Sequence, residues 1–571
     1  MTGALFTQTP VFFIWHIWQM HMAVNQQWWR GGVIYQVYPR SFYDASGDGV
    51  GDLRGVLNKL DHIANMGADA LWLSPFFTSP MKDFGYDVSD YRDVDPLFGS
   101  LQDFDALVAL AHQLGLKVMI DQVLSHTSDQ HPWFVQSRSQ RDNPKADWYV
   151  WADAQADGSP PNNWRSVFGG SSWTWDTRRK QYYLHNFLPE QPDLNYHNPD
   201  VQDQVLEEVA FWLKRGVDGI RIDTANYFHH DAQLRNNPAA KPTWAHADLP
   251  ANPYEMQAHV YDKNRPENIA FFERLRALLD QYGAASVGEI GDANVLDMMV
   301  AYSAPKRLHM TYSFGFLNPN GHADHVRQEV QAFEAAAQRQ GTDSWPCWTL
   351  GNHDSVRVLT RWNGVAKPDD FTRMAAAMVS SLRGSVCWYQ GDELSLEEAD
   401  LPFEALQDPP GIAMWPAYKG RDGCRTPMPW QADATHAGFS TAAQTWLPVM
   451  APHQSRALDA QIARPEAAMH FVRAFWAWRK QQPALWQGEV TYLAGGHDVL
   501  ALIRRPVAGE SGQAWLCAFN LSDTDCQVDA RDWPTGEPMQ WPELPIHQTG
   551  VRTNGQLNMP PYGIYVCAIQ E

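Results

Sequence analysis

The chain has 571 residues, of which 44% are hydrophobic and 19% are charged, as is typical of a globular protein with a sizeable core. Its 44 Lys and Arg residues against 65 Asp and Glu residues give a formal net charge of −21. A surface this acidic repels phosphate backbones and anionic lipids, so neither nucleic acid nor a membrane is an expected partner. The length is sufficient for a barrel of about 250 residues with insertions and a further domain.

Residues 1–27 precede the globular pattern, which begins at Trp28. The apolar stretch from Val11 to Trp18 has no Lys or Arg before it, unlike a signal peptide, and is too short to span a membrane. We expect a peripheral N-terminal extension and assign it no function. The six cysteines are widely spaced without a CxxC pair, which favours reduced thiols in a cytoplasmic protein.

Short β-branched runs alternate with amphipathic helical stretches through most of the chain. The runs lie at 33–38, 70–73, 117–121, 219–223, 286–290, 309–312, 347–350 and 386–389. Eight such units predict an α/β fold of the (β/α)8 TIM barrel type. A doubly wound sheet is the alternative, but no GxGxxG turn follows the first run.

Three connections are far longer than ordinary βα loops, and after about residue 485 the chain turns to short alternating strands between Gly, Asn, Asp and Pro. We therefore expect the barrel to comprise residues 28–123 and 196–484. A loop domain is expected after the third strand, at 124–195, and an antiparallel β-sandwich domain at 485–571. Long loops at one face of a barrel are expected to build a site with walls.

Carboxylic acids stand at the ends of three predicted strands. Arg221 and Asp223 are two residues apart, so both side chains point to one side, and the guanidinium favours the ionised carboxylate that a nucleophile needs. Glu289 has small and apolar neighbours, and desolvation there raises a carboxyl pKa toward that of a general acid. Taken alone, the pair of Arg221 and Asp223 is equally well explained as a structural ion pair, and a lone strand-end Glu is more often structural. Together with Asp354, after the seventh strand, they favour a catalytic site.

Four segments carry a resemblance to a known family. DQVLSHTS, GIRIDTA, VGEI and LGNHD resemble, in order, the signature segments of the α-amylase family, glycoside hydrolase family 13. QPDLNY, with Asp193, resembles a fifth signature in the form seen in the α-glucosidase and oligo-1,6-glucosidase branch. The resemblance covers roughly Trp28 to the C-terminus. It implies that Asp223 is the nucleophile, Glu289 the acid/base and Asp354 the residue that grips the distorted sugar, with no cofactor for catalysis.

The same resemblance implies further contacts with the substrate. FGYDVSDY matches the segment whose Tyr, here Tyr86, stacks on glucose and whose Asp, here Asp87, binds the outer hydroxyls. In RTPMPW, Arg425 is expected to pair with that Asp and to close the site behind a terminal sugar, although in isolation it reads as an exposed loop charge. The other expected substrate-binding residues, which adjoin the signature acids, are His126, Arg221, Thr224, His353 and Arg357.

The segment DASGDGVGD has oxygen ligands spaced as at the start of a calcium loop. The expected ligands are Asp44, Ser46, Asp48, the Val50 carbonyl and Asp52. Ser46 replaces the usual Asp or Asn, and no Glu stands at position twelve, so the pattern departs from an EF-hand. It resembles the divalent-cation loop of the oligo-1,6-glucosidase branch, which implies a structural Ca2+ or Mg2+. A plain polar turn is the alternative.

The resemblance implies a retaining, exo-acting α-glucosidase for maltose-like oligosaccharides that also transfers glucose to sugar or alcohol acceptors, as a monomer or homodimer. Sucrose or trehalose isomerisation and glucosyl transfer use the same three acids, but no RLDRY-like loop follows residue 320. A non-catalytic ancillary partner of transporters is a further alternative, against which this chain keeps all three acids. Ser125 stands where relatives usually carry Asn, and Thr224, after the nucleophile, leaves linkage preference open.

Overall fold

The computed structural model describes residues 27–541 apart from 242–249, 251 and 292–294, and then residues 544–545 and 547–570. The expected N-terminal extension lies outside the described residues except for Gln27. Within the described ranges, no helix has both the length and the apolar character that crossing a membrane requires.

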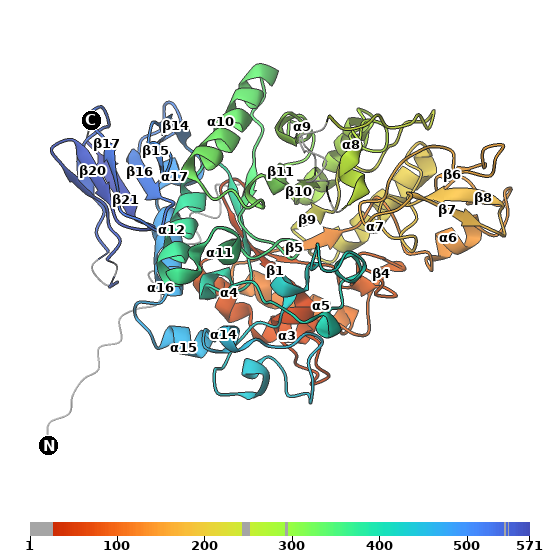
Figure 1. The fold of residues 1–571 in the computed structure, drawn as a ribbon, viewed down its shortest axis with the longest axis horizontal. Coiled ribbons are helices and arrows are strands. Elements are labelled where there is room, and N and C mark those ends of the chain that lie inside the picture. Colours follow the sequence, from red (N-terminus) through yellow and green to blue (C-terminus); the bar gives the residue numbers. More distant parts are fainter. Residues whose placement is uncertain are drawn as a thin grey trace.

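Eight parallel strands form the centre of the molecule, and each begins and ends within one residue of its predicted run (Figure 1). They are β1 (Val33–Val37), β2 (Ala70–Leu73), β5 (Lys117–Gln122), β9 (Gly219–Ile222), β10 (Ala285–Ile290), β11 (Met310–Ser313), β12 (Cys347–Thr349) and β13 (Ser385–Tyr389). Their order in the sheet is β11-β10-β9-β5-β2-β1-β13-β12. A parallel bridge between Thr311 and Pro346 joins the two outer strands, so the sheet closes into a barrel.

Each barrel strand leads to a helix that covers the outside of the barrel. In strand order, these helices are α4 (Leu60–Met66), α5 (Leu101–Gln113), α7 (Pro199–Leu213), α8 (Asn268–Tyr282), α9 (Val295–Tyr302), α10 (Ala323–Gln340), α12 (Pro368–Ser381) and α16 (Ala468–Arg479). All residues of α12 from Phe371 to Ser381 are buried. This burial on every side arises because α12 contacts both the barrel helices and the C-terminal strand β16 (Trp515–Asn520).

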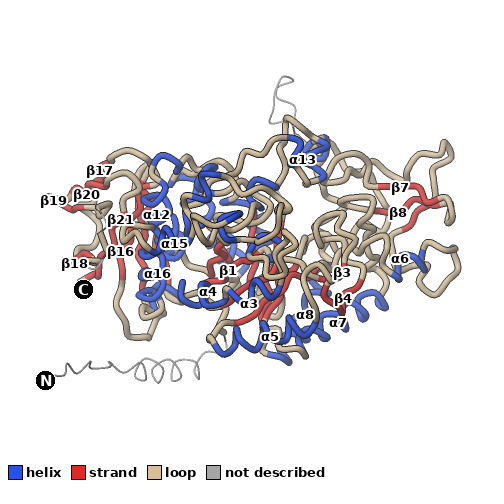
Figure 2. The backbone as a smooth tube through the Cα atoms, turned by 90° about the horizontal axis from the view of Figure 1, so that it is seen from below, coloured by secondary structure: helices blue, strands red, loops and turns tan. Residues whose placement is uncertain are grey.

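Two short sheets extend the barrel loops. The expected insertion after the third strand holds α6 (Pro132–Ser137) and a three-stranded antiparallel sheet of β6 (Trp151–Ala152), β8 (Gln181–Leu184) and β7 (Trp173–Asp176). Figure 2 shows β7 and β8 at the end of the molecule opposite the C-terminal strands. A second, unexpected hairpin, β3 (Phe77–Thr78) and β4 (Asp90–Val94), follows β2.

The C-terminal segment forms two antiparallel sheets. One has the order β14-β15-β16-β21-β18 and the other β17-β20-β19. The remaining bounds are β14 (Glu489–Leu493), β15 (Val499–Arg505), β17 (Cys526–Asp529), β18 (Gly536–Pro538), β19 (Val551–Thr553), β20 (Gln556–Met559) and β21 (Ile564–Ile569). Leu516 and Tyr565 of the first sheet share one apolar core with Leu557 and Met559 of the second, which makes the predicted sandwich.

A buried arginine joins this sandwich to the barrel. Arg504 of β15 is fully buried and its Nη1 donates to the carbonyls of Ser381 (2.8 Å), Leu382 (2.8 Å) and Leu485 (3.0 Å). Its Nη2 donates to the carbonyl of Gly488 at 2.9 Å. One guanidinium therefore saturates backbone groups at the end of α12 and in the connection between the two domains.

All six cysteines are among the described residues, and none is in a disulfide.

Candidate functional site

The predicted acids meet at one end of the barrel. Asp121 lies in β5, Arg221 in β9 and Glu289 in β10, while Asp223 follows β9 directly. Parallel neighbours share an orientation, so the carboxyl ends of these strands open onto the same face. Asp354 reaches that face from the loop after β12.

Arg221 binds three of the carboxylates and is itself fully buried. Its Nη1 donates to Asp121 Oδ1 at 2.8 Å and to Asp223 Oδ1 at 2.7 Å. Its Nη2 donates to Glu289 Oε2 at 2.5 Å. The Tyr312 hydroxyl donates to Glu289 Oε1 at 2.9 Å and accepts from Nη2 at 3.1 Å. The expected nucleophile and acid are thus held by adjacent nitrogens of one guanidinium.

A second cluster surrounds Asp354, whose side chain is 21% exposed. Arg425 Nη2 donates to Asp354 Oδ1 at 2.7 Å, and Arg421 Nη1 lies 3.3 Å from the same oxygen. His353 Nε2 is 3.1 Å from Asp354 Oδ2. Although burial alone raises a carboxyl pKa, His353, Arg425 and Arg421 lower the pKa of Asp354 below its usual range. Asp354 is therefore a firmly ionised group beside the less acidic trio around Arg221.

The expected pair between Asp87 and Arg425 is wrong. Arg425 binds Asp354 and the carbonyl of His353. The carboxylate that pairs across the site is Asp83, whose Oδ1 accepts from Arg421 Nη2 at 2.7 Å. A buried fourth group, Asp408, fixes Arg421 through contacts of 2.9 and 2.6 Å. The ion pair exists, but both of its members stand four residues before the expected ones.

Asp87 instead organises the loop that carries Asp83. Its Oδ1 accepts from the Ser79 hydroxyl (2.9 Å) and the Asp83 backbone N–H (3.0 Å), and its Oδ2 accepts from the Lys82 N–H (2.9 Å). Burial raises the pKa of Asp87 to about 6. Because its oxygens are occupied by its own loop, the structure gives Asp87 a positioning role.

Tyr86 projects from the same loop toward the acids. Its ring stacks on that of His353, with centroids 5.4 Å apart and planes 2° from parallel. Its hydroxyl donates to Asp121 Oδ2 at 3.1 Å and contacts His353 Nε2 at 2.5 Å. Gln36 donates to His353 Nδ1 at 2.7 Å, which leaves Nε2 as the protonated nitrogen that faces Tyr86 and Asp354. Burial keeps the pKa of His353 well below its usual value, although the charge of Asp354 opposes this effect.

His126 lies beside this group with both ring nitrogens engaged. Its Nε2 is 3.0 Å from the Tyr86 carbonyl and its Nδ1 is 2.9 Å from the Ser125 hydroxyl. Ser125 also contacts the hydroxyl of Thr224 at 2.9 Å. Ser125, which stands where relatives usually carry Asn, thus links His126 to Thr224, the residue after the nucleophile. Thr224 has φ 44°, a left-handed conformation that is strained for a β-branched residue.

Arg357 does not join the acids. It is 1% exposed, and its Nη1 donates to the Gln390 carbonyl (3.1 Å) and Asp392 (3.1 Å) while Nη2 donates to the Cys424 carbonyl (3.2 Å). The expected sugar contact of Arg357 is therefore wrong. Its bond to the Cys424 carbonyl holds the chain next to Arg425, so Arg357 positions a site residue.

Burial dominates the protonation of the acids around Arg221. It raises the pKa of Asp121 to about 6 and those of Asp223 and Glu289 to about 7 each, while Arg221 opposes the rise in all three. Two carboxyls bound to one cation titrate together, because the first negative charge disfavours the second. The charge of Asp223 is one of the groups that raise the pKa of Glu289, so an ionised Asp223 favours a protonated Glu289, which is the state that one nucleophile and one general acid require.

The expected cation loop adopts a tight turn at Gly47 and Gly49, which both have positive φ. Asp44 is buried and accepts from Ser46, Gly47, Gly49 and Ser440. Asp52 accepts from the N–H groups of Ala45 and Ser46, while Asp48 is exposed and accepts from the Val50 N–H. The donor set is all oxygen, as Ca2+ and Mg2+ require. Within the described ranges, however, Asp44, Asp48 and Asp52 are not found as a group with ligand atoms within 4.8 Å.

Sequence reasoning missed four residues of the site: Asp83, Asp408, Arg421 and Tyr312. Asp83 and Arg421 carry opposite charges, and each precedes a recognised motif residue by three or four positions, in MKDFGYD and KGRDGCR. Their charges beside those motif residues marked each as a candidate, whereas their pairing depends on the paths of two loops. Tyr312 ends the predicted run 309–312 and pairs in register with Glu289 of β10, so its position at a strand end was a further signal. Asp408 gave none, because its role depends on how a long loop folds onto the site.

Comparisons with known proteins show the family to which the chain belongs. The model of the α-amylase catalytic domain matches residues 36–488. A probable α-glucosidase of Rhizobium meliloti (strain 1021) is 53% identical over 506 residues, which cover 87% of this chain and 90% of that protein. An oligo-1,6-glucosidase of Heyndrickxia coagulans is 33% identical over 544 residues, covering 89% and 94%.

Two solved structures extend the comparison. An α-glucosyl transfer enzyme, XgtA, superimposes with a TM-score of 0.89 at 51% identity, over 95% of this chain and 99% of that one. Trehalulose synthase MutB from Pseudomonas mesoacidophila superimposes with a TM-score of 0.83 at 29% identity, over 95% and 99%. The chain belongs to the α-amylase family of glycoside hydrolases, glycoside hydrolase family 13, in its α-glucosidase branch.

Proposed function

We propose that this protein is a retaining, exo-acting α-glucosidase that releases glucose from the end of maltose-like oligosaccharides and passes part of it to sugar or alcohol acceptors. The observation that carries the proposal is the sharing of Arg221 by Asp223 and Glu289 (2.7 and 2.5 Å). Retaining glycosidases need two carboxyls about 5 Å apart, and attachment to adjacent nitrogens of one guanidinium favours such a close pair.

The reaction has two steps. An oxygen of the Asp223 carboxylate bonds to the anomeric carbon while the bond from that carbon to the leaving oxygen breaks, and Glu289 gives its proton to that oxygen. The oxygen of water, or of a sugar or alcohol, then displaces Asp223, and Glu289 takes the proton from this acceptor. Two inversions at one carbon return the product to the α configuration.

Attack from the chain end is supported by the charged groups around Asp354. Asp83, Arg421 and Arg425 come from two separate loops and meet beside it. Such a fixed set of donors and acceptors suits the hydroxyls of one terminal sugar, and hydrogen bonds to charged groups are the strong ones. Asp354 is proposed to hold these hydroxyls as the ring flattens.

Transfer to acceptors is supported by the likeness to XgtA, which is described as an α-glucosyl transfer enzyme. The sugar or alcohol acceptors and the oligomeric state, monomer or homodimer, are part of this proposal. Product analysis tests the acceptors, and light scattering tests the oligomeric state. A cytoplasmic location stays a prediction from the cysteine pattern.

The experiment follows maltose and sucrose by proton NMR with purified protein, with and without a phenolic acceptor. Initial release of α-glucose, and α-glucosides of the added acceptor, are expected. Asp223→Asn is expected to lose the reaction by about 10^4-fold or more, whereas Asp157→Asn, at an exposed loop position, keeps it. Initial β-glucose excludes retention. Isomerised sugar without glucose assigns the protein to the isomerases instead.

We also propose that the loop with Asp44, Ser46, Asp48, Val50 and Asp52 takes a structural Ca2+ or Mg2+. Its oxygen-only donor set and the ionised Asp44, whose pKa is lowered by hydrogen bonds against the effect of burial, support this assignment.

A further inference from the structure

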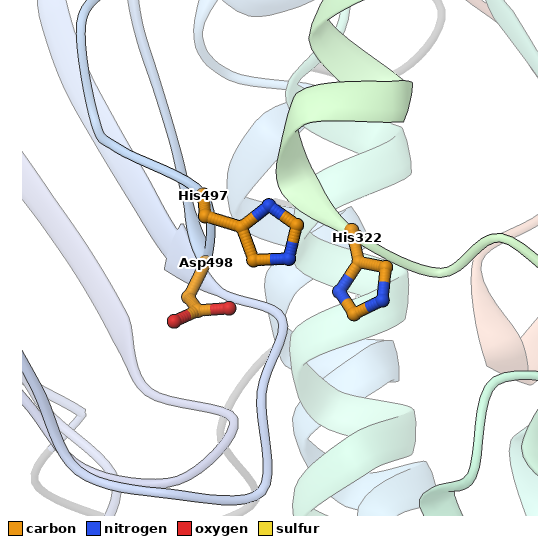
Figure 3. Close-up of side chains that lie close together, drawn as sticks. All are labelled: His322, His497 and Asp498. Carbon is orange, nitrogen blue, oxygen red and sulfur yellow. The ribbon is translucent and has the colours of Figure 1, made fainter.

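Two histidines and an aspartate meet where the barrel and the C-terminal sandwich touch. His322 immediately precedes α10, and His497 and Asp498 lie in the turn between β14 and β15. One ligand atom from each of the three side chains lies within 4.8 Å of the others. Figure 3 shows a nitrogen of each imidazole and the carboxylate of Asp498 facing the same gap.

We infer that His322, His497 and Asp498 form a binding site for a divalent transition-metal ion of the Zn2+ class, which links the barrel to the C-terminal domain. Two imidazoles and a carboxylate are ligands that Zn2+ prefers, whereas Ca2+ and Mg2+ prefer oxygen alone. Three protein ligands leave a fourth position for water. Bonds of about 2.0–2.2 Å place tetrahedral ligand atoms about 3.4 Å apart, so rotation of exposed side chains is sufficient to close the site.

The surroundings of His497 are those of a metal ligand. Its Nδ1 is 3.0 Å from Asp324 Oδ2, which leaves Nε2 as the nitrogen that faces the gap. A carboxylate on the far nitrogen of a histidine fixes the ring orientation and makes the other nitrogen a better donor. Asp324 therefore positions His497 from the first turn of α10.

The backbone that carries the ligands is fixed as well. Arg327 of α10 donates to the carbonyls of Gly496 (3.0 Å) and Val499 (2.6 Å), on either side of His497 and Asp498. The rings of His322 and His497 already lie in contact, with centroids 4.4 Å apart. All three ligands are at least partly exposed, so an ion can reach them from solvent.

The first experiment uses Zn2+ alone with the full chain, free of any polyhistidine tag. Equilibrium dialysis at low micromolar free Zn2+ is expected to give one bound ion per wild-type chain that His322→Gln and His497→Gln both lose. His547→Gln, at an exposed histidine of the same domain, is the matched control and is expected to keep the ion. The inference is overturned if wild type binds no Zn2+, or if the two ligand variants bind as much as the control.

A second measurement separates the ligands from Asp324. Competition with a chromogenic chelator is expected to show zinc affinity reduced about 10–100-fold in Asp324→Asn, with the stoichiometry unchanged. Zn2+ is also expected to raise the melting temperature of wild type but not of His497→Gln, because an ion that binds only the folded state stabilises it. Equal shifts of the melting temperature by Zn2+ in both proteins contradict a site built by these residues.

Discussion

Arg221 governs the chemistry because three acids depend on one buried cation. Asp121, Asp223 and Glu289 all bind its guanidinium directly, while Asp354 has its own cations, Arg421 and Arg425. This partition keeps Asp354 ionised and leaves the other three acids to compete for protons. The residues differ in role because they differ in which arginine they contact.

Asp83→Asn tests the ion pair that replaces the expected one. Arg421 keeps its contacts with Asp408 in this variant, so the protein is expected to fold. Loss of one charged hydrogen bond, about 1.5–3 kcal/mol, predicts a fall in kcat/KM for maltose of about 10–100-fold. Steady-state kinetics measure it, with Asp90→Asn, an exposed neighbour in β4, as control. Unchanged kinetics in Asp83→Asn contradict a role in sugar binding.

The raised pKa of Glu289, about 7, predicts the pH dependence of activity. A general acid must be protonated, so kcat/KM is expected to fall as pH rises through about 7. The pH profile of hydrolysis of an aryl α-glucoside with a good leaving group measures this, because such a substrate depends less on the acid. Above pH 7, kcat/KM is expected to fall for maltose and to fall much less for the aryl glucoside. The same alkaline fall for both substrates contradicts the assignment of Glu289 as the general acid.

The same shift makes a prediction about stability. A carboxyl whose pKa rises from its ordinary 4.5 to about 7 on folding stabilises the fold below pH 4.5, and that contribution is lost as pH rises to about 7. Glu289→Gln has no carboxyl to titrate at this position, so its stability does not include this pH-dependent loss. Its free energy of unfolding relative to wild type is therefore expected to increase by on the order of 3 kcal/mol between pH 4.5 and pH 8. Denaturant titrations at both pH values measure the difference, and a constant difference contradicts it.

At the scale of elements, the loop between β3 and β4 delivers both Asp83 and Tyr86. Met81, Phe84 and Gly85 all have positive φ there, so the path of the loop is sharply bent. Asp87 holds this path by accepting three hydrogen bonds from within the loop. A fully buried aspartate whose hydrogen bonds lie within the loop can therefore control the placement of both Asp83 and Tyr86.

Substitutions of Asp87 separate positioning from direct contact. Asp87→Asn keeps one carbonyl oxygen as an acceptor, so kcat/KM is expected to fall less than tenfold. Asp87→Ala removes all three bonds and is expected to lower kcat/KM about 100-fold, as both Asp83 and Tyr86 shift. Steady-state kinetics with maltose measure both variants. Equal losses in Asn and Ala indicate that the charge itself binds substrate.

The elements also show what a sequence can and cannot reveal. The barrel strands were predictable because each is a short buried β-branched run, such as Val33–Val37. Each run is followed along the chain by a stretch with the 3.6-residue hydrophobic period of a helix. The hairpin of β3 and β4 was not, since β3 has two residues and a register shift interrupts the alternation of β4. For the site, strand-end acids such as Asp223 and Glu289 were readable. Pairings between distant loops, such as Asp83 with Arg421, depend on loop paths that local patterns do not encode.

At the scale of the whole molecule, the cation loop after β1 is packed against the long loop after β13. Asp44 accepts from Ser440 at 2.5 Å, and its backbone N–H donates to the Phe439 carbonyl at 3.0 Å. If the loop takes Ca2+, removal of the ion by a chelator is expected to lower the melting temperature by a few degrees, with activity at 25 °C nearly unchanged. Scanning calorimetry measures the shift. Asp48→Ala is expected to melt at the chelated temperature with or without Ca2+, and a chelator effect of wild-type size in this variant locates the ion elsewhere.

Arg504 makes the barrel and the sandwich inseparable in a way that their shapes do not suggest. The carbonyls that its two terminal nitrogens bind belong to the end of α12 and to the chain that enters the sandwich, yet the guanidinium is supplied by a strand of the sandwich. A barrel truncated before β15 lacks Arg504 and leaves these backbone carbonyls without their hydrogen-bond donor. A crossover between relatives at this boundary therefore keeps the contact only where the incoming strand carries an arginine at position 504, because the acceptors are backbone carbonyls that either parent supplies.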